Sequence, residues 1–413
     1  MPEPTDAARR EAEALAAAFD TERLPPAFFD DPYPVYAALR DHDPVHRCPD
    51  GGYFLARYAD LDAVYRDREH FSSDKKAVFA PKYGSGSPLY AHHTTSLVFS
   101  DPPYHTRVRR QIVAALSPAT TRNMVAGLEA LVGRLCDAIA ARGACDLIED
   151  FAAAIPVEVI GNLLAVPRNE RGALRRWSLA ILGALDPALS AAALECGNQS
   201  VVEFLEFTRT LVAERRRHLR GPEDLLSRLI RDESGGEPLS EDELLHNCIF
   251  LLNAGHETTT NLIGNGLQLL LSHPEARQQL VREPQLITTA VEECLRYESS
   301  NQLGNRLVVA PLELGGRWLP AGTYLTLCIG AANRDPAEFP APERFDVART
   351  PNRHLAFGAG AHACAGMSVA RLEGQVAIGA FLKRFPRARL TGGAERNRRA
   401  RFRGFARLPA AVD

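Results

Sequence analysis

The ten residues FGAGAHACAG, at positions 357–366, are the most informative in this chain of 413. Gly358, Gly360 and Gly366 lack a Cβ, so the backbone can turn tightly here and approach a flat ligand closely. The next residues, 367–373, are typical of a helix, which places Cys364 just before a helix N-terminus. The dipole and the free N–H groups of such a terminus favour a thiolate, the form in which cysteine binds a metal. We therefore interpret Cys364 as a metal ligand.

The other seven cysteines show no comparable pattern, and no Cys-x-x-Cys pair occurs. The chain is long and its N-terminus lacks the apolar stretch of a signal peptide, so we expect reduced cysteines. Most are expected to be small buried hydrophobic residues, and the same interpretation stays open for Cys364 in its glycine-rich loop. His362 with Cys364 would make a poor zinc site, because no second ligand pair stands nearby.

The composition is that of an ordinary globular protein, with 46% hydrophobic and 24% charged residues. The 48 basic and 51 acidic residues nearly balance, so nothing favours a nucleic-acid partner or an anionic membrane surface. No run approaches the roughly 18 apolar residues of a membrane span. We expect a cytoplasmic, monomeric protein without membrane or nucleic-acid partners. The basic run at 396–401 is interpreted as a solvated face.

Helical periodicity dominates the sequence, and strand-like pieces are short. Helices are predicted at 125–141, 202–219, 241–271 and 285–297, and strands at 53–56, 306–309, 312–314 and 324–329. No repeat, linker or change of composition divides the chain. We predict one domain over residues 1–413, mainly α with small β-sheets, in which residues 1–30 form an N-terminal extension.

The second motif, AGHETT at 254–259, lies inside the long apolar helix predicted at 241–271. The Thr258 hydroxyl can bond the carbonyl of Ala254 four residues back and loosen the helix, and Gly255 weakens it further. Next to Glu257, such a place could hold ordered water and deliver protons. The alternative is a soft spot in a core helix, with Glu257 at the surface.

Two further motifs pair charges on one helix face. Glu293 and Arg296 are three residues apart, and His105 and Arg109 are four apart. A pair of cationic donors suits carboxylate groups. Taken alone, the first pair could equally be a solvated ion pair and the second a basic surface patch.

The four motifs together resemble the cytochrome P-450 enzymes, in their order and spacing. Phe-Gly-x-Gly-x-His-x-Cys-x-Gly matches the haem-binding signature of that family at every fixed position, and the resemblance runs from about Asp31 to Leu408. It implies the P-450 fold, with haem b buried between the 241–271 helix and the Cys364 loop. The polar N-terminus looks like the bacterial soluble branch.

The resemblance implies a role for each motif. Cys364 would be the axial ligand of the haem iron. Further haem contacts would come from His105, Arg109, Ala254, Arg306, Phe357, Gly358, His362 and Gly366. Thr258 would hydrogen-bond the oxygen on iron, and Glu257 would relay protons. Glu293, Arg296 and Arg344 would form a buried structural charge network.

The implied reaction is monooxygenation, in which one atom of O₂ enters a small organic substrate. No flavin or nicotinamide domain fits in the remaining sequence, so electrons are expected from separate proteins, a ferredoxin and a ferredoxin reductase. A peroxide-driven haem-thiolate enzyme is the alternative, and a non-catalytic haem-binding protein is the third hypothesis. The Glu257-Thr258 pair favours the O₂ route.

The resemblance also suggests which residues line the substrate pocket: Asn253, Ala254, Asn301, Gln302 and Phe405. The amides hint that a polar group of the substrate is recognised. Surface exposure explains these amides equally well.

Overall fold

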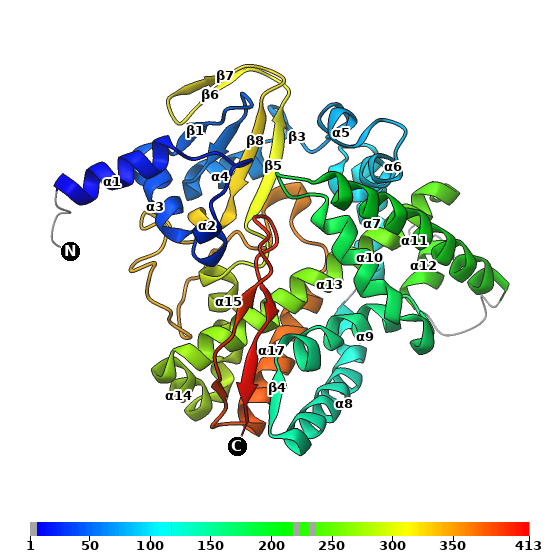
Figure 1. Ribbon diagram of the computed structural model, residues 1–413. Coiled ribbons are helices and arrows are strands. Elements are labelled where there is room, and N and C mark those ends of the chain that lie inside the picture. The colour runs from blue at the N-terminus through cyan, green and yellow to red at the C-terminus, as the bar shows by residue number, and fades with distance from the viewer. Residues whose placement is uncertain (1–5, 117, 218–223, 232–236, 413) are drawn as a thin grey trace.

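One long helix, α13 (Glu241–Ser272), runs through the middle of the computed structural model in Figure 1. It begins at a capping box: the Glu243 N–H donates to Ser240 Oγ, and the Ser240 N–H donates to the Glu243 carboxylate. Most of its side chains are buried, because α9, α10, α11 and α17 pack around it. The structure describes residues 6–116, 118–217, 224–231 and 237–412.

The other helices surround α13 or cover the main sheet. They are α1 (Asp6–Ala17), α2 (Pro26–Asp30), α3 (Tyr33–His42), α4 (Tyr58–Arg66), α5 (Lys76–Tyr83), α6 (Pro88–Thr95), α7 (Tyr104–Ala115), α8 (Pro118–Arg142), α9 (Ala154–Leu163), α10 (Gly172–Gly183), α11 (Ala191–Arg217), α12 (Leu225–Arg231), α14 (Pro274–Arg282), α15 (Ile287–Tyr297), α16 (Ile329–Ala332) and α17 (Met367–Arg384).

The strands form four small sheets. The largest has the order β1-β2-β8-β5-β3, and the others are β4-β12-β9, β10-β11 and β6-β7. Their bounds are β1 (Val45–Arg47), β2 (Tyr53–Leu55), β3 (Phe71–Ser72), β4 (Ala144–Asp146), β5 (Leu303–Val308), β6 (Leu312–Leu314), β7 (Arg317–Leu319), β8 (Tyr324–Cys328), β9 (Arg389–Leu390), β10 (Glu395–Arg396), β11 (Phe405–Arg407) and β12 (Pro409–Ala411).

The predicted mainly α fold with small sheets is confirmed, and so are the positions of the predicted elements. The largest error is at the start of α11, which begins at Ala191 and not at 202. Gly197 weakened the helical pattern there. In the structure it lets α11 approach α6 closely, because a Cβ at Gly197 would lie 2.8 Å from Leu89 Cδ1.

The segment predicted as an N-terminal extension, residues 1–30, packs against the rest of the domain over its described residues 6–30. Helix α1 packs against α3, and Ala16, Phe19 and Phe28 are buried in one hydrophobic cluster with Phe54 of β2. The Phe19 ring meets the Phe54 ring edge-on, at 4.7 Å between centroids. These residues therefore belong to the domain itself.

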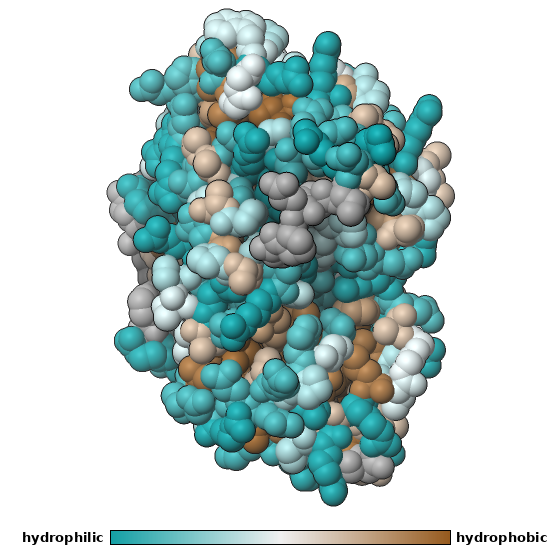
Figure 2. Space-filling model, turned by 90° about the vertical axis from the view of Figure 1, so that its left-hand side faces the viewer, coloured by the Kyte–Doolittle hydropathy of each residue, from teal (hydrophilic) through white to brown (hydrophobic). Residues whose placement is uncertain are grey.

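The molecular surface is mostly polar on the face shown in Figure 2, where hydrophobic residues show only in separate patches. Among the described residues, no helix combines the length and the apolar character that crossing a membrane requires. The C-terminal hairpin formed by β10 and β11 extends into the interior of the molecule. It runs from the base of the molecule to its centre, and its tip lies beside the start of β5 (Figure 1).

Candidate active site

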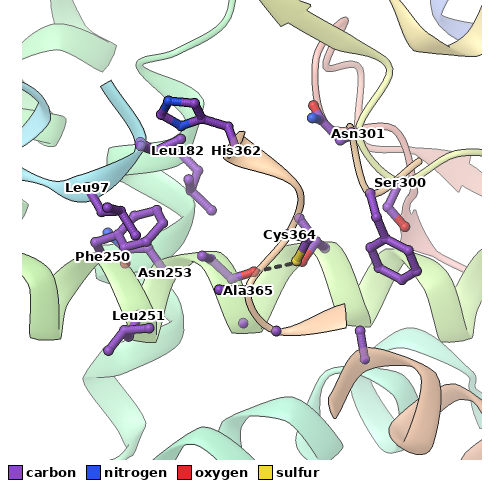
Figure 3. Close-up of a pocket in the computed structure, with 18 of the residues that line it drawn as sticks. Leu97, Leu182, Phe250, Leu251, Asn253, Ser300, Asn301, His362, Cys364 and Ala365 are labelled. Atoms are coloured by element: carbon purple, nitrogen blue, oxygen red, sulfur yellow. Dashed lines mark hydrogen bonds between the residues drawn. The ribbon is translucent and has the colours of Figure 1, made fainter. Parts of the chain in front are cut away.

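A cavity of about 330 Å³ lies between α13 and the loop that carries Cys364. Figure 3 shows Cys364 and His362 on that loop, with α13 passing beneath them. Residues Asn253, Ala254 and Thr258 of α13 line the cavity, as do Cys364 and most of its glycine-rich loop. The structure therefore brings together two motifs that are more than 100 residues apart in the sequence.

Glycine is required in the Cys364 loop at two positions. Gly358 and Gly360 both have φ near +65°, a conformation that side chains rarely adopt. A Cβ at Gly360 would also lie 2.2 Å from the backbone oxygen of Tyr65 in α4. The Cys364 N–H closes the loop by donating to the Phe357 carbonyl at 2.9 Å. The backbone conformation of the loop therefore fixes the position of Cys364 at the wall of the cavity.

We expected the local structure to favour the thiolate form of Cys364. The helix is where we expected it, but the net pKa of the thiol is raised. Helix α17 does begin just after it, at Met367, and a hydrogen bond from the Gly366 N–H lowers the pKa of the thiol. Burial is the larger effect, and it raises the pKa of Cys364 above the ordinary value. A bound metal ion would supply the missing stabilisation, because a coordinating thiol is deprotonated.

Four hydrogen-bond donors, two of them arginines, gather at one side of the cavity: His105, Arg109, Arg306 and His362. The His105 and His362 rings lie 3.9 Å apart between centroids, and Arg109 donates to the carbonyl of Ala363. Among the described residues, no carboxylate forms an ion pair with any of the four, and His105 Nε2 is buried without a partner. The group is therefore built to receive an anion.

Electrostatics confirm the lack of counter-charge in this group. Burial, with Arg306 and other cations nearby, lowers the pKa of His362 to about 2. Burial and Arg109 lower the pKa of His105 to about 4. The two carboxylates of haem would pair with the two arginines and accept hydrogen bonds from the two histidines, and a flat ring would fit the glycine-rich loop. The residues present therefore fit haem, on the chemistry of the donor set.

The opposite wall of the cavity is the middle of α13. Thr258 lines the cavity, and its hydroxyl donates to the Ala254 carbonyl at 2.7 Å, as predicted. The helix stays continuous through this turn. Glu257 is not at the surface: it is 3% exposed and faces away from the cavity.

Glu257 is held by Arg399, from the tip of the C-terminal hairpin. Arg399 Nη1 donates to both carboxylate oxygens, at 2.7 and 2.9 Å, and its Nη2 donates to the Leu179 carbonyl of α10. Burial raises the pKa of Glu257 to about 7, and the Arg399 charge opposes that rise. An acid with a pKa near neutrality can both release and take up a proton, one residue from Thr258.

Comparison with known proteins identifies the family. The sequence model described as Cytochrome P450 matches residues 188–410. The biotin biosynthesis cytochrome P450 of Bacillus subtilis (strain 168) is 34% identical over 390 residues, which cover 94% of this chain and 97% of the relative. The chain belongs to the cytochrome P450 family.

Other P450 proteins are similar to this chain in sequence or structure over nearly its whole length. The 6-deoxyerythronolide B hydroxylase of Saccharopolyspora erythraea is 36% identical over 401 residues, covering 94% of this chain and 97% of the relative. The crystal structure of P450BioI in complex with hexadec-9Z-enoic acid ligated acyl carrier protein matches with a TM-score of 0.88 at 34% identity, covering 93% and 99% of the two chains. The protein is a haem-thiolate P450 monooxygenase that binds haem b.

The structural charge network of this P450 differs from the prediction at one residue. Glu293 and Arg296 are fully buried and joined by two hydrogen bonds, at 2.7 and 2.9 Å. Arg344, however, points to solvent and approaches only Asp346. Arg349 replaces it, because its Nε lies 3.2 and 3.1 Å from the two Glu293 oxygens. Arg344 contributes only its backbone carbonyl, which accepts from Arg296 and Arg349.

Two of the predicted pocket residues do not line the P450 cavity. Gln302 turns away from it, donating to the Ser299 carbonyl and toward the Tyr33 hydroxyl. Phe405 is buried under Arg396, whose guanidinium lies 4.0 Å from the ring centroid. Asn253, Ala254 and Asn301 do line the cavity, as predicted. The hairpin reaches the cavity with Arg401 and Phe402.

The basic run at 396–401 is therefore only partly a solvated face. Arg398 is exposed, but Arg396 and Arg399 pair with the buried acids Glu298 and Glu257. The hairpin tip lies beside the residues just before β5, through a bridge between Phe402 and Asn301. Sequence reasoning also missed His92 and His93 of α6, which are buried and line the cavity. Two adjacent histidines inside an apolar stretch were the only available signal.

Proposed function

We propose that Cys364 would hold the haem iron through its thiolate and that Thr258 would act across the same cavity, in the monooxygenation of a small organic substrate. The observation that carries this proposal is that both side chains line one cavity, beside four hydrogen-bond donors that form no ion pair with a carboxylate among the described residues. Haem, when bound, supplies the iron that activates O₂. His105, Arg109, Arg306 and His362 would hold its propionates.

The proton path would run through this chain's own side chains. Thr258 Oγ1 faces the cavity and can donate a hydrogen bond there in place of its bond to Ala254. Glu257 would resupply the proton, since burial sets its pKa to about 7. For that step the carboxylate must leave or loosen its bond with Arg399, which makes Arg399 a positioning residue of the acid.

Replacement of Cys364 by serine tests the ligand assignment. We expect the Cys364→Ser protein to lose the red-shifted band that a thiolate ligand gives to the reduced CO complex, because a serine hydroxyl does not replace the thiolate. The measurement is the difference spectrum of reduced protein with and without CO. Survival of that band in the variant would refute the assignment.

Replacement of Thr258 by alanine separates the O₂ route from the peroxide-driven alternative. On the O₂ route, the Thr258→Ala variant should consume the reductant as before but release hydrogen peroxide, with product per electron pair falling about tenfold or more. Peroxide-driven turnover should hardly change. A variant that keeps full coupling with O₂ would remove Thr258 from the proton path.

We propose that electrons come from separate partners, a ferredoxin and a ferredoxin reductase. The support is that the helices and sheets from α1 to β12 all belong to one P450 fold. The chain should turn over only when both proteins are added, and turnover with NADPH alone would refute the proposal.

The names of two relatives mention an organic molecule. One is named as a hydroxylase of 6-deoxyerythronolide B, and another was crystallised with an acyl carrier protein bearing hexadec-9Z-enoic acid. We propose an organic substrate with a largely apolar body, since leucines and phenylalanines such as Leu97, Leu182 and Phe250 line much of the cavity.

A further inference from the structure

The cavity has an apolar side and a polar side. Figure 3 shows Leu97, Leu182 and Phe250 on one side of Cys364, and Ser300 and Asn301 on the other. The polar side is made by two segments that pair through their backbones: Arg403 N–H donates to the Ser300 carbonyl, and Gln302 N–H donates to the Arg401 carbonyl. The first side is mainly apolar, although Asn253 lies there too, whereas the second side carries Ser300 and Asn301.

Arg401 is the charged group on the polar side. It lines the cavity and also an adjoining outer pocket, with which the cavity shares Leu185, Gly304 and Asn305. Its backbone is fixed at both ends, because its N–H donates to Asp186 Oδ1 at 3.0 Å and its carbonyl accepts from Gln302. The side chain thus stands where the cavity opens outward.

The Arg401 guanidinium has no counter-ion. Its side chain forms no hydrogen bond or ion pair with any described residue, and its Nε is buried without a partner. Three other hairpin arginines are paired: Arg399 binds Glu257, and Arg396 and Arg403 bind Glu298. Asp186 accepts the Arg401 N–H, and its carboxylate lies in the fields of Arg399, Arg401 and Lys82 together.

Two neutral donors line the same cavity as this cation. Ser300 is 5% exposed, and its hydroxyl has no partner. His93 is 3% exposed and has an unpartnered Nε2. Burial, with the charges of Lys82 and Arg401, lowers the pKa of His93 to about 3, so the ring is neutral and can donate an N–H. A guanidinium without an ion pair, together with hydroxyl and imidazole donors, suits a carboxylate.

We propose that the substrate of this P450 carries a carboxylate, which Arg401 binds at the mouth of the cavity while an apolar body extends past Thr258. This proposal rests on the proposed monooxygenase function and adds the class of substrate. Arg401 would orient the substrate, so the carbon that is oxidised would lie at the end remote from the acid group.

The test is a set of matched ligands on the ferric holoenzyme. Straight-chain and aryl-substituted monocarboxylic acids, each with its methyl ester and the corresponding primary alcohol, are titrated while the spin-state change of the haem is recorded. At least one acid should bind about tenfold to hundredfold more tightly than its own ester, as expected for a charge-assisted hydrogen bond. The alcohols should bind no more tightly than the esters. Equal affinity of acids and esters across the set would overturn the proposal.

Substitutions of single arginines test whether Arg401 causes the preference for acids over esters. Arg401→Gln should lose the preference for the acid and keep the affinity for the ester, whereas Arg401→Lys should keep most of the preference. Arg398→Gln is the matched control, because Arg398 is an exposed arginine of the same hairpin. A preference that survives in Arg401→Gln would overturn the proposal. Loss of haem from Arg401→Gln would also overturn it, since Arg401 would then serve a propionate.

The reduced CO spectrum keeps this proposal separate from the function on which it rests. A wild-type protein without the thiolate band would refute the proposed function itself. A protein with that band but no preference for acids would refute only the carboxylate assignment.

Discussion

At the scale of single residues, this P450 shows how far a side chain's role depends on its partners. Glu293 binds two arginines and one amide, and it also accepts from the backbone N–H of Asp346. The negative charge is therefore fully solvated by the protein. Because every partner compensates the same buried charge, loss of one partner costs more than a single hydrogen bond.

Arg349 occupies the place in this network that we had predicted for Arg344, and this difference can be tested with two variants. Arg349→Ala should lower the free energy of unfolding by about 3–5 kcal/mol, because the buried Glu293 carboxylate loses a close cation. Arg344→Ala should change it by about 0.5 kcal/mol or less, as for other surface positions. Denaturant unfolding of the two variants, followed by circular dichroism, measures both values. A larger loss for Arg344→Ala would restore the original assignment.

At the scale of elements, the C-terminal hairpin completes the acid site of α13. Glu257 comes from the helix and Arg399 from the hairpin, 142 residues later in the chain. Arg399 also ties α10 to the same point through the Leu179 carbonyl. Three elements therefore share one ion pair, and the state of the acid depends on all of them.

The raised pKa of Glu257 predicts a pH dependence of stability. A carboxyl group titrates near 4.3 in the unfolded chain, and near 7 in the folded protein. Between these values the folded state binds more protons than the unfolded state, so this group's contribution to stability falls as pH rises from about 4.5 to about 7. The slope should be smaller in Glu257→Gln, which cannot titrate.

The measurement is urea unfolding of wild type and Glu257→Gln at several pH values. Arg399 is left without its carboxylate in the variant, but that cost is the same at every pH in this range. Only the difference in slope therefore reports on Glu257. Parallel slopes for the two proteins would show that the acid titrates at its ordinary pKa, held there by Arg399.

At the scale of the whole molecule, the cofactor site joins distant parts of the chain. His105 and Arg109 come from α7, Arg306 from β5 and His362 from the Cys364 loop. Burial disfavours the charged forms of all four groups, and haem propionates would offset that cost. The apoprotein is thus expected to be less stable at this site than the holoenzyme.

The cationic group predicts different acid sensitivity of the two forms. Burial and Arg109 lower the pKa of His105 to about 4 in the protein without haem, against about 6.5 in an unfolded chain. The folded apoprotein then binds fewer protons, so stability is lost as pH falls below about 6.5. Haem carboxylates favour the protonated ring, which should reduce that loss in the holoenzyme.

Thermal unfolding of apoprotein and holoenzyme between pH 7 and pH 5 checks this prediction. His256→Asn provides a control, because His256 is buried in α13 and does not line the cavity. This variant should alter the acid sensitivity of both forms alike, whereas His105→Asn should reduce the difference between them. An apoprotein no more acid-sensitive than the holoenzyme would contradict the prediction.

The sequence predicted the elements and the motif residues that face each other, because spacing and helical periodicity are local properties. It did not predict which arginine reaches Glu293, since Arg344 and Arg349 lie in an irregular segment whose turns set their direction. It also took the 396–401 run for a solvated face. Charge patterns indicate exposure on average, but here Arg399 and Arg396 pair with two buried acids, Glu257 of α13 and Glu298 after α15.

The spacing of two hairpin residues has a consequence for how the enzyme would respond to its substrate. Arg399 holds the acid of α13, and Arg401, two residues later, faces the mouth of the cavity. Because both belong to one short turn, we expect a ligand held by Arg401 to affect the ion pair of Arg399 as well. A substrate that Arg401 holds poorly would then bind weakly and would also divert reductant from product.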